Sequence, residues 1–99
     1  MNAELVKEKK KSNEKPRDRW VVVMYNDDTT TMDFVVAVLI EVFNKSFEDA
    51  INLMLQIHKS TKQVVGFYPE KLANAKCDKA ITLARVYGFN DFTVKVEKV

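Results

Sequence analysis

Hydrophobic residues along the chain occur in short β-branched runs and in longer segments with helical spacing. Residues 20–25 (WVVVMY) and 63–68 (QVVGFY) are rich in β-branched and aromatic side chains. They predict two strands, of which the first is buried on both faces. Residues 92–96 (FTVKV) alternate apolar and polar positions, which predicts a third, half-exposed strand.

A first helix is predicted after the strand at residues 20–25. Thr30 is followed three residues later by Asp33, a capping pattern that places the start of the helix near Thr31. The helix is expected to end at residues 44–45. One apolar stripe at helical spacing runs along it, formed by Met32, Val35, Val36, Leu39, Ile40 and Phe43.

Two further helices are predicted. Ser46 with Asp49 repeats the capping pattern and begins the second helix. Pro69 suits the first position of the third helix, where its missing N–H costs nothing, and Gly88 is a natural stop. The expected order is β-α-α-β-α-β. A small three-stranded antiparallel sheet with three helices massed against one face would be an α+β two-layer sandwich.

Residues 1–19 differ from the rest of the chain in composition. They carry seven Lys or Arg and four Asp or Glu, with few large apolar side chains. Such a segment cannot bury enough surface to order itself. We therefore expect a flexible charged tail at residues 1–19 and one domain at residues 20–99. The tail is either a solubilising leader or an arm that docks on a partner.

Composition excludes several classes of protein. The net charge of +2 is too small to indicate nucleic-acid binding, and the apolar runs fall short of the ~20 residues that cross a bilayer. No secretory signal is expected. Cys77 is the single cysteine, so no internal disulfide and no zinc site are expected. A cytoplasmic setting without membrane contact fits these features.

The residues offer little for catalysis. His58 is the one histidine, nothing places it beside Cys77 or another nucleophile, and two glycines make no phosphate loop. Asp27 and Asp28 could hold a hard cation, but adjacent carboxylates are a common turn. The expectation is a binding protein that is not an enzyme and has no metal or cofactor.

Several residues that are unremarkable alone could form a binding pocket together. A lone histidine on an apolar helix face is more often a core residue, and methionines more often fill gaps. Met54 and His58, however, are four residues apart and share one face. If the second helix packs beside the first, Met32, Val35 and Met54 would form an apolar pocket. Its polar rim would be Asn26, Asp27 and His58.

Three segments resemble one known family. They are VVVMYNDDTTTMDFV at residues 21–35, AINLMLQIHKSTKQVVG at residues 50–66, and Tyr68-Pro69 with Ala73 and Lys76. The chain is similar in these segments to ClpS, the adaptor of the bacterial N-degron (N-end rule) pathway. The resemblance covers roughly four-fifths of the chain, and two separate motifs at the right mutual spacing make it specific.

The resemblance implies a function and a set of site residues. ClpS proteins bind substrates that begin with Leu, Phe, Tyr or Trp and deliver them to a Clp ATPase–protease. Asn26 and His58 would hydrogen-bond the substrate's free α-amino group, with Asp27 assisting through water. The hydrophobic pocket would be bordered or lined by Asp28, Thr30, Met32, Val35, Met54, Ile57 and Phe92.

The partner surface departs from the family pattern. Glu70 and Lys76 would contact the N-terminal domain of the Clp AAA+ ATPase, but Lys71, Asn74 and Ala75 replace residues usual in the third helix. Two other hypotheses stay open. One is a small α/β protein-docking module with no terminus-binding pocket, in which Met32, Met54 and His58 would be sealed. The other is a metal-dependent hydrolase at Asp27 and Asp28.

Overall fold

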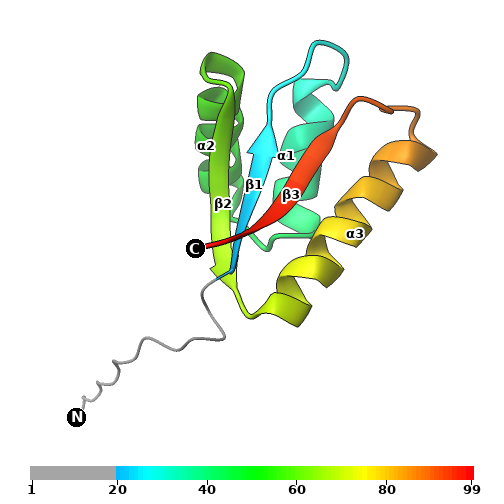
Figure 1. Ribbon diagram of the computed structural model, residues 1–99. Helices are drawn as coiled ribbons and strands as arrows, with labels where there is room; N and C mark the ends of the chain where they lie inside the picture. The colour runs from blue at the N-terminus through cyan, green and yellow to red at the C-terminus, as the bar shows by residue number, and fades with distance from the viewer. Residues whose placement is uncertain (1–19) are drawn as a thin grey trace.

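The sheet is built around strand β1 (Trp20–Tyr25), in a computed structural model that describes residues 20–99. β1 pairs antiparallel with β2 (Lys62–Tyr68) on one side and with β3 (Thr93–Lys98) on the other. The strand order is therefore β2-β1-β3 (Figure 1). The tail predicted at residues 1–19 lies outside the described residues.

Three helices complete the domain: α1 (Met32–Glu41), α2 (Phe47–Lys59) and α3 (Glu70–Val86). They follow the strands in the order β-α-α-β-α-β and lie against one face of the sheet (Figure 1). The predicted α+β two-layer sandwich is confirmed. No helix within residues 20–99 combines the length and the apolar character needed to span a bilayer.

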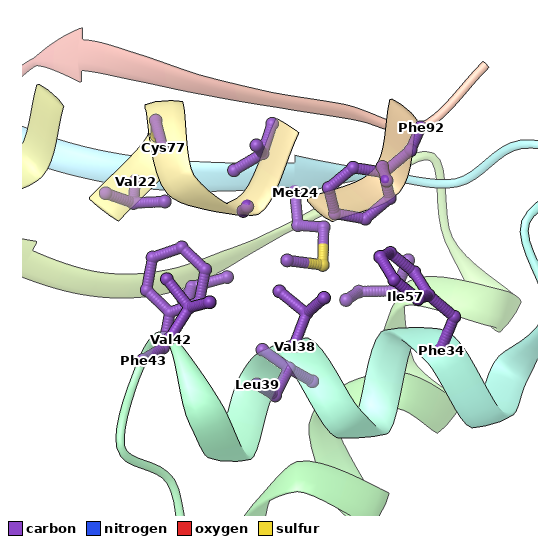
Figure 2. Close-up of a cluster of buried hydrophobic side chains, with 14 of the residues drawn as sticks. Val22, Met24, Phe34, Val38, Leu39, Val42, Phe43, Ile57, Cys77 and Phe92 are labelled. Atoms are coloured by element: carbon purple, nitrogen blue, oxygen red, sulfur yellow. The ribbon is translucent and has the colours of Figure 1, made fainter. Parts of the chain in front are cut away.

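The core lies between the sheet and the helices (Figure 2). Val22 and Met24 lie two residues apart on β1, so both point to the helical layer, and both are fully buried. From α1, Val38 and Leu39 meet them. Helix α3 contributes small residues at helical spacing, namely Ala73, Cys77, Ala80 and Ala84. Small side chains let this long helix approach the sheet closely.

The starts of the first two helices follow local capping chemistry. Ser46 caps α2 as predicted, and its Oγ accepts a hydrogen bond from the Asp49 N–H at 3.1 Å. The cap of α1 is Thr31, whose Oγ1 accepts from the Phe34 N–H at 3.2 Å. The prediction of Thr30 was wrong by one residue, because Thr30 belongs to a turn closed by Asp27.

Other boundaries differ by one to four residues. Pro69 is the N-cap of α3, not its first helical residue, because its ψ of 150° is extended. Strand β3 starts at Thr93 and runs to Lys98, since it pairs with β1 along its whole length. Helix α1 ends at Glu41, before the positive φ of 59° at Asn44. Gly88, with φ of 85°, follows α3 as predicted.

Candidate functional site

An open cavity of about 370 Å³ lies where the β1–α1 loop meets the last turns of α2. The loop covers residues 26–31, and the first turn of α1 continues it. The cavity is lined by Asn26, Asp27, Asp28, Thr29, Thr30, Thr31, Met32, Val35, Met54, Ile57 and His58. Polar residues come mainly from the loop and apolar residues from the two helices.

The apolar floor of the cavity comes from two helix faces. Met32 and Val35 are three residues apart on α1, and Met54 and Ile57 have the same spacing on α2. Ile57 is 3% exposed and belongs to the core, whereas Met32 is 44% exposed at the entrance. The apolar floor therefore packs against the core on its inner side, through Ile57, and faces solvent on its outer side, at Met32.

The polar rim brings Asn26 and His58 together from distant parts of the sequence. His58 is exposed in the last turn of α2. The Asn26 N–H donates to the carbonyl of Thr61 at 3.0 Å, which ties the start of the loop to the turn that follows α2. This bond fixes the position of Asn26 in the cavity lining, to which His58 also belongs.

Asp27 organises the loop with one carboxylate oxygen. Its Oδ1 accepts the backbone N–H groups of Thr29 at 2.9 Å and Thr30 at 2.7 Å. Partial burial raises the pKa of this carboxyl, but the hydrogen bonds from Thr30 and Thr29 outweigh it and lower the pKa overall. Asp27 is therefore a carboxylate at neutral pH. The two backbone bonds end on Oδ1 and leave Oδ2 for a ligand.

Thr30 lines the cavity, but its hydroxyl oxygen is not presented to it. Its Oγ1 is buried and has no hydrogen-bond partner within the part of the chain that the structure describes. Buried polar atoms normally have a partner. The Thr30 hydroxyl is an exception, since it is closed off from solvent although the residue lines the cavity.

Phe92 is the one predicted pocket residue that does not line the cavity. It is 2% exposed and lies in the core, edge-on to Phe34 with ring centroids 5.6 Å apart (Figure 2). The resemblance to the family placed it in the pocket, although the loop before the last strand aligns only loosely with that family. Its aromatic ring instead packs in the core against Phe34 of α1.

Sequence reasoning missed Thr29 and Thr31 in the cavity lining, and Asp91 next to it. Thr29 and Thr31 line the cavity, and the Thr29 Oγ1 donates to Asp91 Oδ2 at 3.0 Å. The turn around Thr29 could have been expected, since an Asp two residues earlier commonly accepts such a backbone bond. No local signal links Thr29 with Asp91, because the pair is 62 residues apart.

The two predicted ATPase-contact residues lie on α3, whose start is at the opposite end of the sheet from the β1–α1 loop (Figure 1). Glu70 is exposed. Lys76 is engaged within the protein: its Nζ donates to the Val42 carbonyl at 2.7 Å and to Asn44 Oδ1 at 3.0 Å. It also lies 5.6 Å from the ring centroid of Tyr68. Lys76 thus holds the connection after α1 in place.

Across residues 20–99, no group of three or more His, Cys, Asp or Glu side chains is placed to hold an ion. Burial, with the nearby charge of Asp78, raises the pKa of the Cys77 thiol to about 11, so this cysteine stays protonated near neutral pH.

Comparison with known proteins identifies a matching family and related sequences. A family profile described as "ATP-dependent Clp protease adaptor protein ClpS" matches residues 15–95. The ATP-dependent Clp protease adapter protein ClpS of Treponema denticola is 46% identical over 82 residues, which cover 83% of this chain and 80% of the relative. The protein of the same description from Nitrosospira multiformis is 40% identical over 84 residues, covering 85% and 82%.

A solved structure is also similar. Agrobacterium tumefaciens ClpS2, bound to L-phenylalaninamide, superposes with a TM-score of 0.77 at 29% identity, over 81% of this chain and 95% of that one. Its fold therefore agrees with the sandwich described above. With a family profile that matches most of its length and relatives at 40–46% identity, this chain belongs to the ClpS family of ATP-dependent Clp protease adaptor proteins.

Proposed function

We propose that this chain binds proteins through a bulky hydrophobic first residue together with its free α-amine, and delivers them to a Clp ATPase–protease. The observation that carries the proposal is one cavity with an apolar floor and a rim of hydrogen-bond acceptors. A concave apolar site with a few convergent polar groups is the usual form of a ligand pocket.

The floor accounts for preference among side chains. Met32, Val35, Met54 and Ile57 present apolar surface, and burying a large side chain such as Leu or Phe contributes about 1.5–3 kcal/mol. Met32 stands at the entrance, where it would contact the branch of a β-branched side chain. First residues Leu, Phe, Tyr and Trp suit this floor, since each places its bulk beyond Cβ.

The rim accounts for preference for a chain terminus. A charged amine loses water when it enters the cavity, and leaving it without acceptors would be costly. Asn26 and His58 offer a carbonyl oxygen and an imidazole nitrogen as direct acceptors. Asp27 offers a negative charge, with its free Oδ2 assisting through water. Asp28 and Thr30 border the same opening.

The ligand of the related structure has the required chemistry. L-phenylalaninamide carries a free α-amine, an aromatic side chain and an amide in place of the carboxylate, so it mimics the first residue of a peptide. It binds Agrobacterium tumefaciens ClpS2, whose fold this chain shares. The same recognition at the cavity of this chain requires no cofactor and no catalytic group.

Delivery requires a second surface. We assign contact with the N-terminal domain of a cytoplasmic Clp AAA+ ATPase to the exposed face of α3, where Glu70 is accessible. Lys76 would take part only if it exchanged its internal bonds for partner contacts. Since α3 starts at the far end of the sheet, one molecule could hold substrate and ATPase together (Figure 1).

The alternative is a docking module whose Met32, Met54 and His58 are sealed. Met32 is 44% exposed, His58 is exposed and all three line an open cavity. Accessibility therefore favours the terminus-binding adaptor.

The test is binding of short peptides that differ only in the first residue, measured by fluorescence anisotropy. Leu- and Phe-initiated peptides should bind much more tightly than Gly- or Ser-initiated ones. A Leu-initiated peptide with an acetylated amine should bind at least about tenfold more weakly than its free twin, because acetylation removes a charge-assisted bond. Equal binding of the free and acetylated peptides would reject the proposal.

A further inference from the structure

The loop that forms the polar rim is held from outside by the segment between α3 and β3. Thr29 lies in the middle of this loop, and its Oγ1 is 3.0 Å from Asp91 Oδ2. The same hydroxyl is 3.3 Å from Asp27 Oδ1, while the Thr29 N–H donates to that Asp27 oxygen at 2.9 Å. A hydroxyl has one proton, so the shorter distance assigns it to Asp91. The backbone N–H of Thr29 thus donates to the Asp27 carboxylate, and its hydroxyl donates to the Asp91 carboxylate.

Asp91 itself is well supported. Its carbonyl accepts from Thr93 Oγ1 at 3.0 Å at the start of β3. The next residue, Phe92, is buried against Phe34, and its N–H donates to the Phe89 carbonyl at 3.3 Å. Arg85 Nη1 donates to the same carbonyl at 3.1 Å. The carboxylate of Asp91 therefore projects from a segment that is anchored to the core and to α3.

The geometry points to Asp91 as a positioning residue of the terminus site, an inference that rests on the proposed function. Asp91 holds Thr29, and Thr29 together with Thr30 holds Asp27 Oδ1 in the turn. Asp27 Oδ2 is then oriented for the α-amine. Asp91 touches no ligand in this scheme, since it does not line the cavity. It reduces the freedom of the rim before binding, and such preorganisation raises affinity.

Two substitutions separate positioning from charge. Asp91→Ala removes the acceptor, and we expect it to weaken binding of a Leu-initiated peptide about three- to tenfold, the effect of one lost hydrogen bond. Asp91→Asn keeps an acceptor oxygen and should stay within about twofold of the parent. Asn90→Ala, an exposed neighbour with no role in the scheme, is the matched control. Equal losses in both Asp91 variants would show a charge effect and overturn the positioning role.

A double-mutant cycle tests the pathway through Thr29. If Asp91 acts through the Thr29 hydroxyl, the two losses should not add. The double variant Thr29→Val/Asp91→Ala should then bind the Leu-initiated peptide no more weakly than the single variant with the lower affinity. Additive losses would overturn the proposal. Thermal unfolding of each variant shows whether the domain remains folded.

A measurement without peptide separates this inference from the proposed function. Backbone ¹⁵N relaxation of the free protein should show lower order parameters at Thr29 and Thr30 in Asp91→Ala, falling toward the value of about 0.6 typical of flexible backbone. Unchanged order parameters overturn the inference, whatever the peptides do. Lower order parameters in a protein that binds free and acetylated peptides alike would reject the proposed function, and with it the role of Asp91 in recognition.

Discussion

The loop before α1 (residues 26–31) and the connection after it (residues 42–46) lie at opposite ends of the helix, and each contains an asparagine. After α1, Asn44 Oδ1 and the Val42 carbonyl both accept from the ammonium group of Lys76. Before α1, Asn26 is exposed and lines a cavity that His58 also lines. Similar polar groups therefore serve structure at one end and are presented to solvent at the other.

The difference between the two ends lies in what the opposite element supplies. Helix α3 passes the end of α1 and brings Lys76, whose positive charge suits two oxygen acceptors. Helix α2 ends beside the start of α1 and brings His58, Met54 and Ile57, which leave a hollow. A polar group whose partner comes from the chain stabilises the fold, whereas one that faces an open apolar hollow is available to a ligand.

Phe92→Ala should have the largest effect, because Phe92 packs in the core against Phe34 of α1. Removing a buried aromatic ring should lower the free energy of unfolding by about 3–5 kcal/mol. Chemical denaturation measures it. Phe47→Ala is the control, since Phe47 is 67% exposed and should change stability by less than about 0.5 kcal/mol. If Phe92→Ala instead leaves stability intact and changes only peptide preference, Phe92 acts as a pocket wall.

His58→Ala probes the open end directly. Loss of one charge-assisted hydrogen bond should weaken binding of a free Leu-initiated peptide about tenfold to hundredfold, with little change in thermal unfolding because His58 is exposed. Lys59→Ala, the exposed neighbour on α2, is the control. Fluorescence anisotropy that shows the same affinity for both variants would remove His58 from the rim.

Lys76→Met probes the closed end. It keeps most of the apolar stem but removes two hydrogen bonds, so we expect the free energy of unfolding to fall by about 1–2 kcal/mol. Peptide affinity should remain that of the parent. Lys79→Met on the exposed side of α3 serves as the matched variant. The contrast between the two ends breaks down if Lys76→Met lowers peptide affinity while stability is unchanged.

Met32→Ala tests whether the entrance of the cavity selects side-chain shape. The smaller residue should admit Ile- and Val-initiated peptides, reducing their penalty relative to Leu about threefold or more. Leu55→Ala is a suitable control, because Leu55 is 41% exposed, similar to Met32, and lies outside the cavity lining. An unchanged ranking of Leu, Phe, Ile and Val peptides would show that Met32 does not set selectivity.

The smallest expected effect concerns acid stability through Asp27. The folded-state pKa of this carboxyl is lowered below its usual value of 3.8, so its ionised form stabilises the fold above that value. This contribution is lost as pH falls through the lowered pKa. Between pH 5 and pH 3, the melting temperature of the parent should therefore fall more than that of Asp27→Asn. An identical acid dependence in the two proteins would mean that the turn bonds do not favour the carboxylate.

Several features followed from the sequence through local physics. Strand β1 was predicted at the observed bounds, since a β-branched run ended by Asn26-Asp27-Asp28 has few other conformations open to it. The Ser46 cap was found because it bonds to a backbone group three residues away. Helical spacing placed Met32 with Val35, and Met54 with His58, and their meeting required only that adjacent helices pack together.

The features that sequence reasoning misplaced or did not foresee rest on specific contacts, most of them between distant residues. The start of α1 lies one residue later than predicted, because Thr29 and Thr30 belong to a turn in which their backbone N–H groups donate to Asp27. Phe92 entered the core and Asp91 reached Thr29 because of the path taken by the segment after α3. Lys76 turned inward because α3 crosses the end of α1.

The sequence by itself determined the order of the elements, the apolar helix faces and the polar turn that borders the cavity. These rest on propensities and periodicities that act over a few residues. Only the tertiary structure decided which polar groups find partners inside the protein and which face the cavity. That choice depends on how elements more than 30 residues apart approach one another, as for Lys76 with Val42 and Thr29 with Asp91, and periodicity along the chain carries no information about it.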